Sequence, residues 1–490
     1  MEFNSQFLID TLPVLSLLGF GLLVMLLDAY KNDKVTSFVS ILGILISMIL
    51  AIPGVVASEE MVLTFYNEIY SGGLAGLIHI FLCISGIVSI PFITDYLKKN
   101  NQSHLQGEVF ALILFSLIGM NLLATANDLI ITFIGLEIMS VSLYILAGSF
   151  KKDLRSNEAA LKYFLLGAFA SAFLLFGISL VYGMTGTTML NKIASASPTL
   201  IHDKFPVLFY PALALIAVGF LFKLSAFPFH VWTPDVYTGA PTPLVGFMAT
   251  GSKMASVIAF GFILNSLLPQ SGDKLSQLIA ILAVLSMIYG NIVAAQQKNI
   301  KRLLAYSSIS HSGYMLLGVA GGPEGYKAAI LYMLIYTFMT VAAFALISSI
   351  ENSEDDLNYE NWKGLGVKNI PFGVIMSVLM FSLAGFPPLA GFIGKYFVFL
   401  AAVKGGYTAH AVVGILTSVV GAYYYLRVLV TMFFEKPTDG TETKSLNISN
   451  SILVPIAVLA IVILIIGILP SPITSYLDIL YGKAGFFAKL

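Results

Sequence analysis

Long apolar runs recur along the whole chain and are separated by short polar connections. A helix that crosses a hydrocarbon core ~30 Å thick needs roughly 20 mainly apolar residues. By this measure about fourteen runs qualify: 8–27, 35–53, 72–94, 108–125, 129–149, 157–182, 207–230, 240–268, 275–296, 299–319, 326–350, 371–400, 408–434 and 450–470. An open sheet cannot satisfy its backbone in lipid, so each run is predicted to be a helix. The pattern predicts an all-α membrane protein, and the first run is expected to be retained because no basic segment or cleavage site accompanies it.

Two of these runs are interrupted by proline. The seventh reads GFLFKLSAFPFHVWTPDVYTGAPTPL and contains Pro228, Pro234, Pro241 and Pro243, and the twelfth contains GFPPLAG. Proline removes a backbone donor and clashes with the preceding turn, so both helices are predicted to break. Broken backbone at membrane depth is tolerated only where protein covers it or a wet cavity lines it. Paired broken spans therefore indicate an internal repeat with a transport path at its centre.

The predicted organisation is one polytopic membrane domain over residues 1–490. Three N-terminal helices occupy 1–100, a first five-helix repeat 105–270, a second five-helix repeat 271–435, and a C-terminal helix and tail 446–490. The two repeats correspond to spans 4–8 and 9–13. Because each holds an odd number of spans, the second is expected to be inverted relative to the first.

Basic residues concentrate in the odd-numbered connections, and cytoplasmic loops carry an excess of lysine and arginine. The odd connections hold Lys31, Lys34, Lys98, Lys99, Lys151, Lys152, Arg155, Lys298, Lys301, Arg302, Lys363, Lys368, Lys436 and Lys444. The even connections hold Lys192, Lys204, Lys274, Lys327 and Lys404, and the tail adds Lys483 and Lys489. We therefore expect the odd connections to be cytoplasmic and both termini to lie outside.

A few charges fall inside the apolar runs, although only 11% of the residues are charged. Glu137 lies about eight residues into its run, which at ~1.5 Å per residue is roughly 12 Å deep. The basic members of this set are Lys162, Lys223, Lys253, Lys395 and Arg427. Ionisable residues in spans are costly and mark pathways or charge pairs. The structural alternative is a carboxylate satisfied by a neighbouring lysine, or a lysine that snorkels to the interface.

Lys253 is near the middle of its run, where snorkelling does not reach water. Lys395 follows the second break, and we expect its ammonium group to face protein or water and to be stabilised by carbonyl groups freed at that break.

Hydroxyl groups surround a histidine in the tenth run, KRLLAYSSISHSGYML. Hydroxyl groups and water can bridge protons, and His311 is accompanied there by Tyr306, Ser307, Ser308, Ser310, Ser312 and Tyr314. This favours a relay role for His311 over a packing role. His230 borders the first break and is a weaker candidate, whereas His79 and His410 are interpreted as structural. The acidic run 351–360 is interpreted as a solvated loop.

The residue types favour proton chemistry. Hard metal ions prefer oxygen ligands, and several lysines along one path repel cations. Burial lowers the pKa of an ammonium group and a nearby carboxylate raises it again, so such a group can switch its proton. We therefore predict a proton pathway through Glu137, Lys223, Lys253, His311 and Lys395.

Other chemistry has little support. The single cysteine, Cys83, excludes a disulfide, a CxxC metal site and an iron–sulfur cluster within the chain. No Walker loop or dinucleotide fingerprint is present, so neither catalytic, cofactor-binding nor metal-binding residues are expected here. A net charge of zero gives no reason to expect nucleic acid as a partner.

Four segments make the chain resemble the antiporter-like membrane subunits of respiratory complex I: GLEIMSVSLYILAG (135–148), FHVWTPDVYTGAPTPLVGFMATGSKMAS (229–256), KRLLAYSSISHSGYMLLG (301–318) and FSLAGFPPLAGFIGKYFVF (381–399). The resemblance implies proton pumping in a bacterial inner membrane, driven by electron transfer from NADH to quinone in other subunits. Flavin, iron–sulfur clusters and the NADH site would then lie in those partners, with other antiporter-like and small membrane subunits as neighbours. It also implies that Glu137, Lys223, Lys253, His311 and Lys395 hold the family's functional positions.

Within this family, Lys395 and the pair Leu136–Glu137 favour the subunit N branch. The subunit M branch has a glutamate at the first position and usually a tryptophan before the glutamate at the second, and the subunit L branch carries a long lateral helix. Two alternatives remain: a subunit of a Mrp-type cation/proton antiporter, which shares much of this pattern, and a membrane-embedded transferase, which would need a large loop with acidic catalytic residues.

Overall fold

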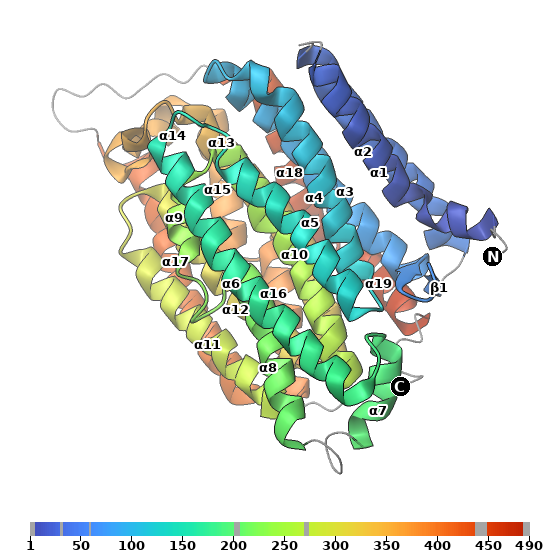
Figure 1. Ribbon diagram of the computed structural model, residues 1–490. Helices are drawn as coiled ribbons and strands as arrows, with labels where there is room; N and C mark the ends of the chain where they lie inside the picture. The colour runs from blue at the N-terminus through green and yellow to red at the C-terminus, as the bar shows by residue number, and fades with distance from the viewer. Residues whose placement is uncertain are drawn as a thin grey trace.

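The computed structural model describes residues 5–29, 33–57, 60–199, 206–268, 274–436 and 448–483 as a bundle of long helices (Figure 1). Ten helices in these ranges are long and apolar enough to cross a membrane, or up to twelve if each of two bent pairs is one span. The all-helical, multi-span architecture predicted from the apolar runs is confirmed. The lysines at 31, 204, 444 and 489, which entered the orientation prediction, lie outside the described residues.

The long helices follow the predicted runs closely. They are α1 (Ser5–Asp28), α2 (Asp33–Ala57), α3 (Gly73–Lys99), α4 (Gln106–Thr125), α5 (Leu129–Ala147), α6 (Leu154–Thr185), α8 (Pro206–Lys223), α10 (Thr242–Leu267), α11 (Lys274–Ala295), α12 (Ile300–Ala320), α13 (Gly322–Ile350), α15 (Ile370–Ala384), α16 (Ala390–Lys404), α17 (Thr408–Phe434) and α18 (Asn450–Ile468).

Side-chain caps fix where several helices begin. Asp128 accepts from the backbone N–H of Ile130 at the start of α5, and Asn299 accepts from that of Arg302 at the start of α12. Such caps satisfy backbone donors that a helix leaves unpaired in its first turn. The caps therefore fix where α5 and α12 begin, and with that the positions of the side chains further along each helix.

Helix α10 lies at the centre of the bundle and is buried along its whole length. It packs against α13, α3, α4 and α12. Helices α1 and α2 stand at the periphery (Figure 1), where much of their surface is exposed. Polar side chains of α10 and α12 are thus enclosed by protein rather than by lipid.

Both predicted breaks are present. Helix α8 ends at Lys223, and the non-helical stretch 224–231 follows before the short helix α9 (Trp232–Gly239). Helix α15 ends at Ala384, and α16 begins at Ala390 after a turn in which Gly385 has φ 91°. The proline prediction is confirmed, and each broken span leaves a helix end inside the bundle.

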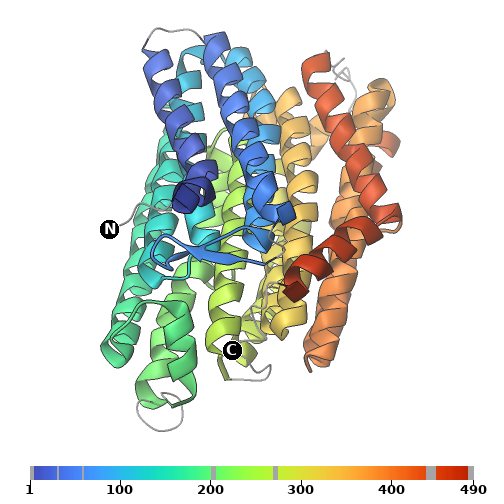
Figure 2. The same cartoon turned by 90° about the vertical axis from the view of Figure 1, so that its right-hand side faces the viewer.

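Several small elements were not predicted from the sequence. They are the antiparallel hairpin β1 (Val62–Thr64) and β2 (Ile69–Ser71), the helices α7 (Leu190–Thr199), α14 (Leu365–Lys368) and α19 (Ser471–Lys483), and the short 3-10 helices η1 (Ser103–Leu105), η3 (Glu354–Leu357) and η4 (Tyr359–Trp362). Helix α19 is bent by 74° from α18, and Figure 2 shows it running across the bundle near the hairpin.

The solvated-loop interpretation of 351–360 is wrong in part. Asp356 is buried and its carboxylate accepts from the backbone N–H groups of Asn352 and Ser353. Glu351 forms an ion pair of 3.5 Å with the buried Lys301. The acidic side chains thus fasten the η3 turn to the bundle, because burial of a carboxylate requires such partners.

Candidate functional site

The row of ionisable residues predicted from the sequence lies inside the bundle. Exposed fractions are 2% for Lys223, 0% for Lys253, 1% for His311 and 6% for Lys395. Snorkelling is therefore ruled out for these lysines, and each ammonium group must find its partners in protein or enclosed water.

Lys223, the last residue of α8, sits in an aromatic cage. Its Nζ donates to Tyr144 Oη at 2.8 Å. The same atom lies 4.7 Å from the ring centroid of Tyr144 and 5.3 Å from that of Tyr163. Tyr163 in turn stacks on Trp232 with ring centroids 4.3 Å apart. Ring faces attract a desolvated cation, so the cage stabilises the charged lysine without a carboxylate in contact.

Glu137 of α5 is partly exposed. Ser171 Oγ of α6 donates to its carboxylate. Within the described ranges no lysine or arginine comes within 4 Å of it, so the expected pair with Lys223 is not a direct ion pair. Tyr144 lies seven residues after Glu137, two helical turns along the same face. Lys223 therefore contacts α5, the helix that carries Glu137, through the Tyr144 hydroxyl group.

Lys253 connects α10 to α12 through three hydrogen bonds. Its Nζ donates to Ser308 O at 2.9 Å, Ser308 Oγ at 2.6 Å and Ser312 Oγ at 2.8 Å. Ser312 Oγ also donates to the carbonyl oxygen of Leu224. That carbonyl follows directly after Lys223, so a single hydroxyl group links Lys253 to the first helix break.

His311 is bonded at both ring nitrogens. Nδ1 lies 2.6 Å from Tyr332 Oη and Nε2 lies 3.0 Å from Tyr425 Oη. Tyr425 Oη is also 2.6 Å from Ser307 Oγ. A hydroxyl group can donate or accept, so the histidine can hold a proton on either nitrogen without losing a partner. This is the arrangement that a relay requires.

Lys395 lies at the second helix break. Its Nζ donates to the carbonyl oxygens of Leu383 at 3.0 Å and Ala384 at 2.8 Å, and to Ser418 Oγ at 3.2 Å. The carbonyls belong to the last turn of α15, where a helix leaves acceptors unpaired. The expected stabilisation by freed carbonyls is confirmed. The centroid of the Tyr314 ring lies 5.0 Å from this Nζ and 5.5 Å from the centroid of the His311 ring. Tyr314 therefore contacts both Lys395 and His311.

The secondary candidates divide into two groups. Ser307 and Tyr314 contact the row as described, and Ser310 is buried next to His311. His230 instead packs on Phe227 and on Tyr289, and the centroids of the His230 and Tyr289 rings are 4.3 Å apart. Tyr306 lies against the same Tyr289 ring. Among the described residues, neither His230 nor Tyr306 forms a hydrogen bond or an ion pair with Lys223, Lys253 or Lys395.

The remaining ionisable residues lie off the row. Lys162 pairs with Glu158 and Asp235, and Arg427 lies over the Tyr359 ring. His79 is held between Ser47 and Asn121, and His410 lies against Tyr407.

Several partners of the row were missed by sequence reasoning: Tyr144, Tyr332, Ser418 and Tyr425. Ser308 and Ser312 were expected around His311, and the structure bonds both of them to Lys253. Tyr144 had a signal, because it is in phase with Glu137 on one helix. Tyr332, Ser418 and Tyr425 had none, since nothing in α13 or α17 marks which hydroxyl group turns inward.

The fold belongs to a known class of membrane protein. Residues 126–421 match the family model described as NADH:quinone oxidoreductase/Mrp antiporter, transmembrane. NADH-quinone oxidoreductase subunit N of Trichlorobacter lovleyi is 41% identical over 466 residues, 94% of each chain. Subunit N 1 of Chloroherpeton thalassium is 40% identical over 473 residues, 96% of this chain and 97% of its own. The chain belongs to the NADH-quinone oxidoreductase subunit N family.

Solved structures agree with this assignment. A chain of respiratory complex I from Thermus thermophilus with bound Aureothin aligns with TM-score 0.80 and 32% identity, covering 94% of this chain and 98% of that one. The archaeal membrane-bound sulfane sulfur reductase gives TM-score 0.86 at 25% identity, with 98% of each chain covered. The Mrp complex from Dietzia sp. gives 0.85 at 19% identity over 99% of this chain and 98% of that one, a likeness of fold alone.

Proposed function

We propose that this chain is a proton-translocating membrane subunit of an NADH:quinone oxidoreductase, working within a larger complex I. The observation that carries the proposal is the enclosed row of Lys223, Lys253, His311 and Lys395 between two helix breaks. Electron transfer belongs to partner subunits, which hold NADH, flavin, iron–sulfur clusters and quinone. This chain contributes the proton path and no redox group.

The proposed path follows the contacts. Glu137 and Tyr144 lie on the helix that faces Lys223, so a change at Glu137 alters the field at that ammonium group. Ser312 and Ser308 then lead to Lys253 on one side of α12, and Ser307, Tyr425 and His311 continue on the other. Tyr314 borders both His311 and Lys395. Enclosed water is expected to bridge the steps longer than a hydrogen bond.

The proposed topology has fourteen spans. Helices α8 with α9 and α15 with α16 count as broken spans seven and twelve, and α12 counts as a span because its polar residues face protein. Spans 4–8 and 9–13 are the two inverted repeats, with boundaries near 105–270 and 271–435. The orientation places the odd connections in the cytoplasm of a bacterial cell and both termini outside its inner membrane.

The Mrp-type antiporter alternative has weaker support. Its solved relative shares the fold at 19% identity, whereas relatives near 40% identity are named subunit N. Sodium-dependent transport by the purified protein would favour the antiporter alternative.

The test is proton pumping by the assembled complex in membrane vesicles. Lys253→Ala removes three hydrogen bonds from α12 and the only charge at mid-span of α10. We expect NADH-driven pumping and the coupled quinone reduction to fall at least about tenfold, which corresponds to ~1.4 kcal/mol in a barrier. Lys152→Ala, an exposed lysine between α5 and α6, is the matched control and should pump normally.

Assembly of each variant is checked by co-purification of the flavin-containing partner subunits. Normal pumping by an assembled Lys253→Ala complex would contradict a proton path through Lys253.

A further inference from the structure

A cavity of about 140 Å³ opens between α13, α16 and α19, away from the ionisable row. One part of its wall is apolar and is formed by Leu331, Phe397, Leu400 and Leu477. The other part is charged and is formed by Glu324, Lys327, Lys404 and Asp478. A wall divided in this way fits a molecule that is itself half apolar and half charged.

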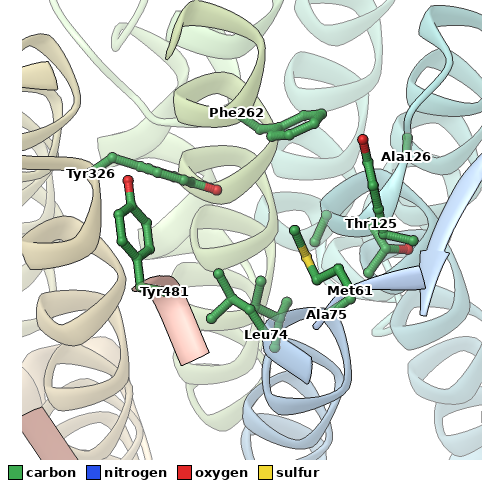
Figure 3. A pocket seen from close by; sticks show the side chains of 11 residues that line it. Met61, Leu74, Ala75, Thr125, Ala126, Phe262, Tyr326 and Tyr481 are labelled. Atoms are coloured by element: carbon green, nitrogen blue, oxygen red, sulfur yellow. The ribbon is translucent and has the colours of Figure 1, made fainter. Parts of the chain in front are cut away.

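Helix α19 sets the depth of this cavity in the membrane. It follows the last span, α18, at an angle of 74°, and buries Leu477 and Leu480 while Tyr476 and Ile479 are exposed. Figure 3 shows Tyr481 of α19 beside Tyr326 of α13, and Tyr481 Oη donates to Pro323 O at 2.7 Å. A short amphipathic helix that crosses the end of a span lies at the level of the lipid head groups. The charged part of the cavity is therefore at head-group depth.

The charged residues of the cavity form two neighbouring groups of opposite net charge. Lys327 Nζ pairs with Glu324 at 2.8 Å and with Asp478 at 2.7 Å. One positive and two negative groups leave this triad with a net charge of −1. Lys404 forms no ion pair with any described residue and supplies the charge of +1 across the cavity.

We propose that this cavity binds a phospholipid with a zwitterionic ethanolamine head group. Its phosphate would contact Lys404, its ammonium group would donate to Glu324 or Asp478, and an acyl chain would pack on Leu331, Phe397 and Leu400. The phosphate of an anionic head group would also use Lys404, but such a head group has no ammonium group to offset the surplus carboxylate of the triad. A choline head group has no N–H to donate to a carboxylate. The inference rests on the proposed function only in placing α18 in a bilayer.

The site would act on the proton path through α16. Lys404 is in the last turn of this half-helix and Lys395 is in its first part, nine residues earlier. A lipid held against α13 and α19 would fix the end of α16 that is remote from the break.

The test uses the purified complex that contains this chain. After mild delipidation it is titrated with phosphatidylethanolamine, phosphatidylcholine or phosphatidylglycerol, and bound lipid is counted by native mass spectrometry. We expect phosphatidylethanolamine to bind about tenfold more tightly than the other two, and Lys404→Gln and Asp478→Asn each to weaken it about tenfold, ~1.4 kcal/mol. Lys152→Gln should bind as the unaltered complex does.

Leu331→Trp fills the apolar part without changing a charge and should also displace the lipid. Equal binding of the three lipids, or unchanged binding in both Lys404→Gln and Leu331→Trp, would overturn the proposal. So would a cross-link from Lys404→Cys to a neighbouring subunit that occupies the cavity. Pumping of the unaltered complex is measured separately, so failure of lipid binding is distinct from failure of the proposed function.

Discussion

The Lys223 ammonium group has a single hydrogen-bond acceptor among the described residues, and it is a phenol rather than a carboxylate. Gly167 of α6 makes room for that phenol, because a Cβ there would overlap Tyr144 Oη. The oxygen is thus held in place by packing and does not depend on where Glu137 turns. Two different groups on α5 can influence one lysine, one by contact and one through its field.

Tyr144→Phe tests the contact. Phenylalanine keeps the ring of the cage but removes the acceptor, and a hydrogen bond to a charged group contributes about 1.5–3 kcal/mol. We expect proton pumping by the assembled complex to fall roughly tenfold, measured as NADH-driven acidification of inverted vesicles.

Tyr163→Phe is the matched control, since its ring lies near the same Nζ but no hydrogen bond between its hydroxyl group and Lys223 is present in the described structure. Equal effects of the two variants would show that the rings matter and the Tyr144 hydroxyl group does not.

The buried ionisable residues could be predicted from the sequence, and so could the carbonyl partners of Lys395, but most side-chain partners on other helices could not. A charged residue within an apolar run can be recognised from the sequence alone, because the free energy of placing it in lipid is unfavourable whatever residues surround it in the fold. Lys253 and Lys395 were found in this way. Ser418, a partner of Lys395, and Tyr332 and Tyr425, the partners of His311, lie on other helices, and which face of those helices turns inward is decided only when the bundle packs.

Among the elements, the turn between α15 and α16 controls the Lys395 side chain most directly. Gly385 has φ 91°, in the left-handed region that favours glycine. A Cβ at this position would lie 3.0 Å from Lys395 Cδ and 3.2 Å from its Nζ. The glycine thus serves both the backbone turn and the close approach of the lysine.

Gly385→Ala should strain the turn by about 1–2 kcal/mol and push the ammonium group away from the carbonyls of α15. We expect pumping to fall severalfold, measured in the same vesicles together with the melting temperature of the purified complex. Gly406→Ala is a close control, because Gly406 has φ 88° but a Cβ added there would meet no described atom within 4 Å. If both variants lose stability equally and pump equally, the contact with Lys395 has no role in pumping.

Sequence patterns found the long elements and missed the short ones for physical reasons. Proline breaks helices wherever it sits, so both interruptions were predicted and are confirmed. Helix α19 has only 13 residues and an apolar stripe on one side, too little for the apolar-run criterion. Each strand of the β1–β2 hairpin has three residues, and its pairing is defined by cross-strand bonds that no local pattern specifies.

At the scale of the whole molecule, the N-terminal helices are attached by a buried polar cluster as well as by apolar packing. His79 of α3 lies 2.8 Å from Ser47 Oγ of α2 and 2.7 Å from Asn121 Nδ2 of α4. Ser47 Oγ donates in turn to Pro13 O of α1 at 2.6 Å. The cluster therefore joins four helices around one imidazole, in agreement with the structural interpretation of His79.

His79→Ala should loosen this attachment without touching the proton path. Leaving the buried Asn121 amide without its imidazole partner costs about 1–3 kcal/mol, while Ser47 keeps its bond to Pro13 O. We therefore expect a lower melting temperature and faster proteolysis of the purified complex. Pumping per assembled complex should remain within about twofold. His410→Ala, at the half-buried start of α17, should change neither measurement. A large loss of pumping with unchanged stability would instead place His79 in the path.

The acceptors of Lys395 have a consequence for genetics. Two of its three partners are main-chain oxygens of Leu383 and Ala384, and every amino acid supplies the same oxygen. A saturation screen would therefore score both positions by the size and polarity of their side chains and would pass over their electrostatic role. Replacing the following amide linkages with esters, which weakens the carbonyl acceptor while keeping the side chain, is the kind of chemical edit that would expose it.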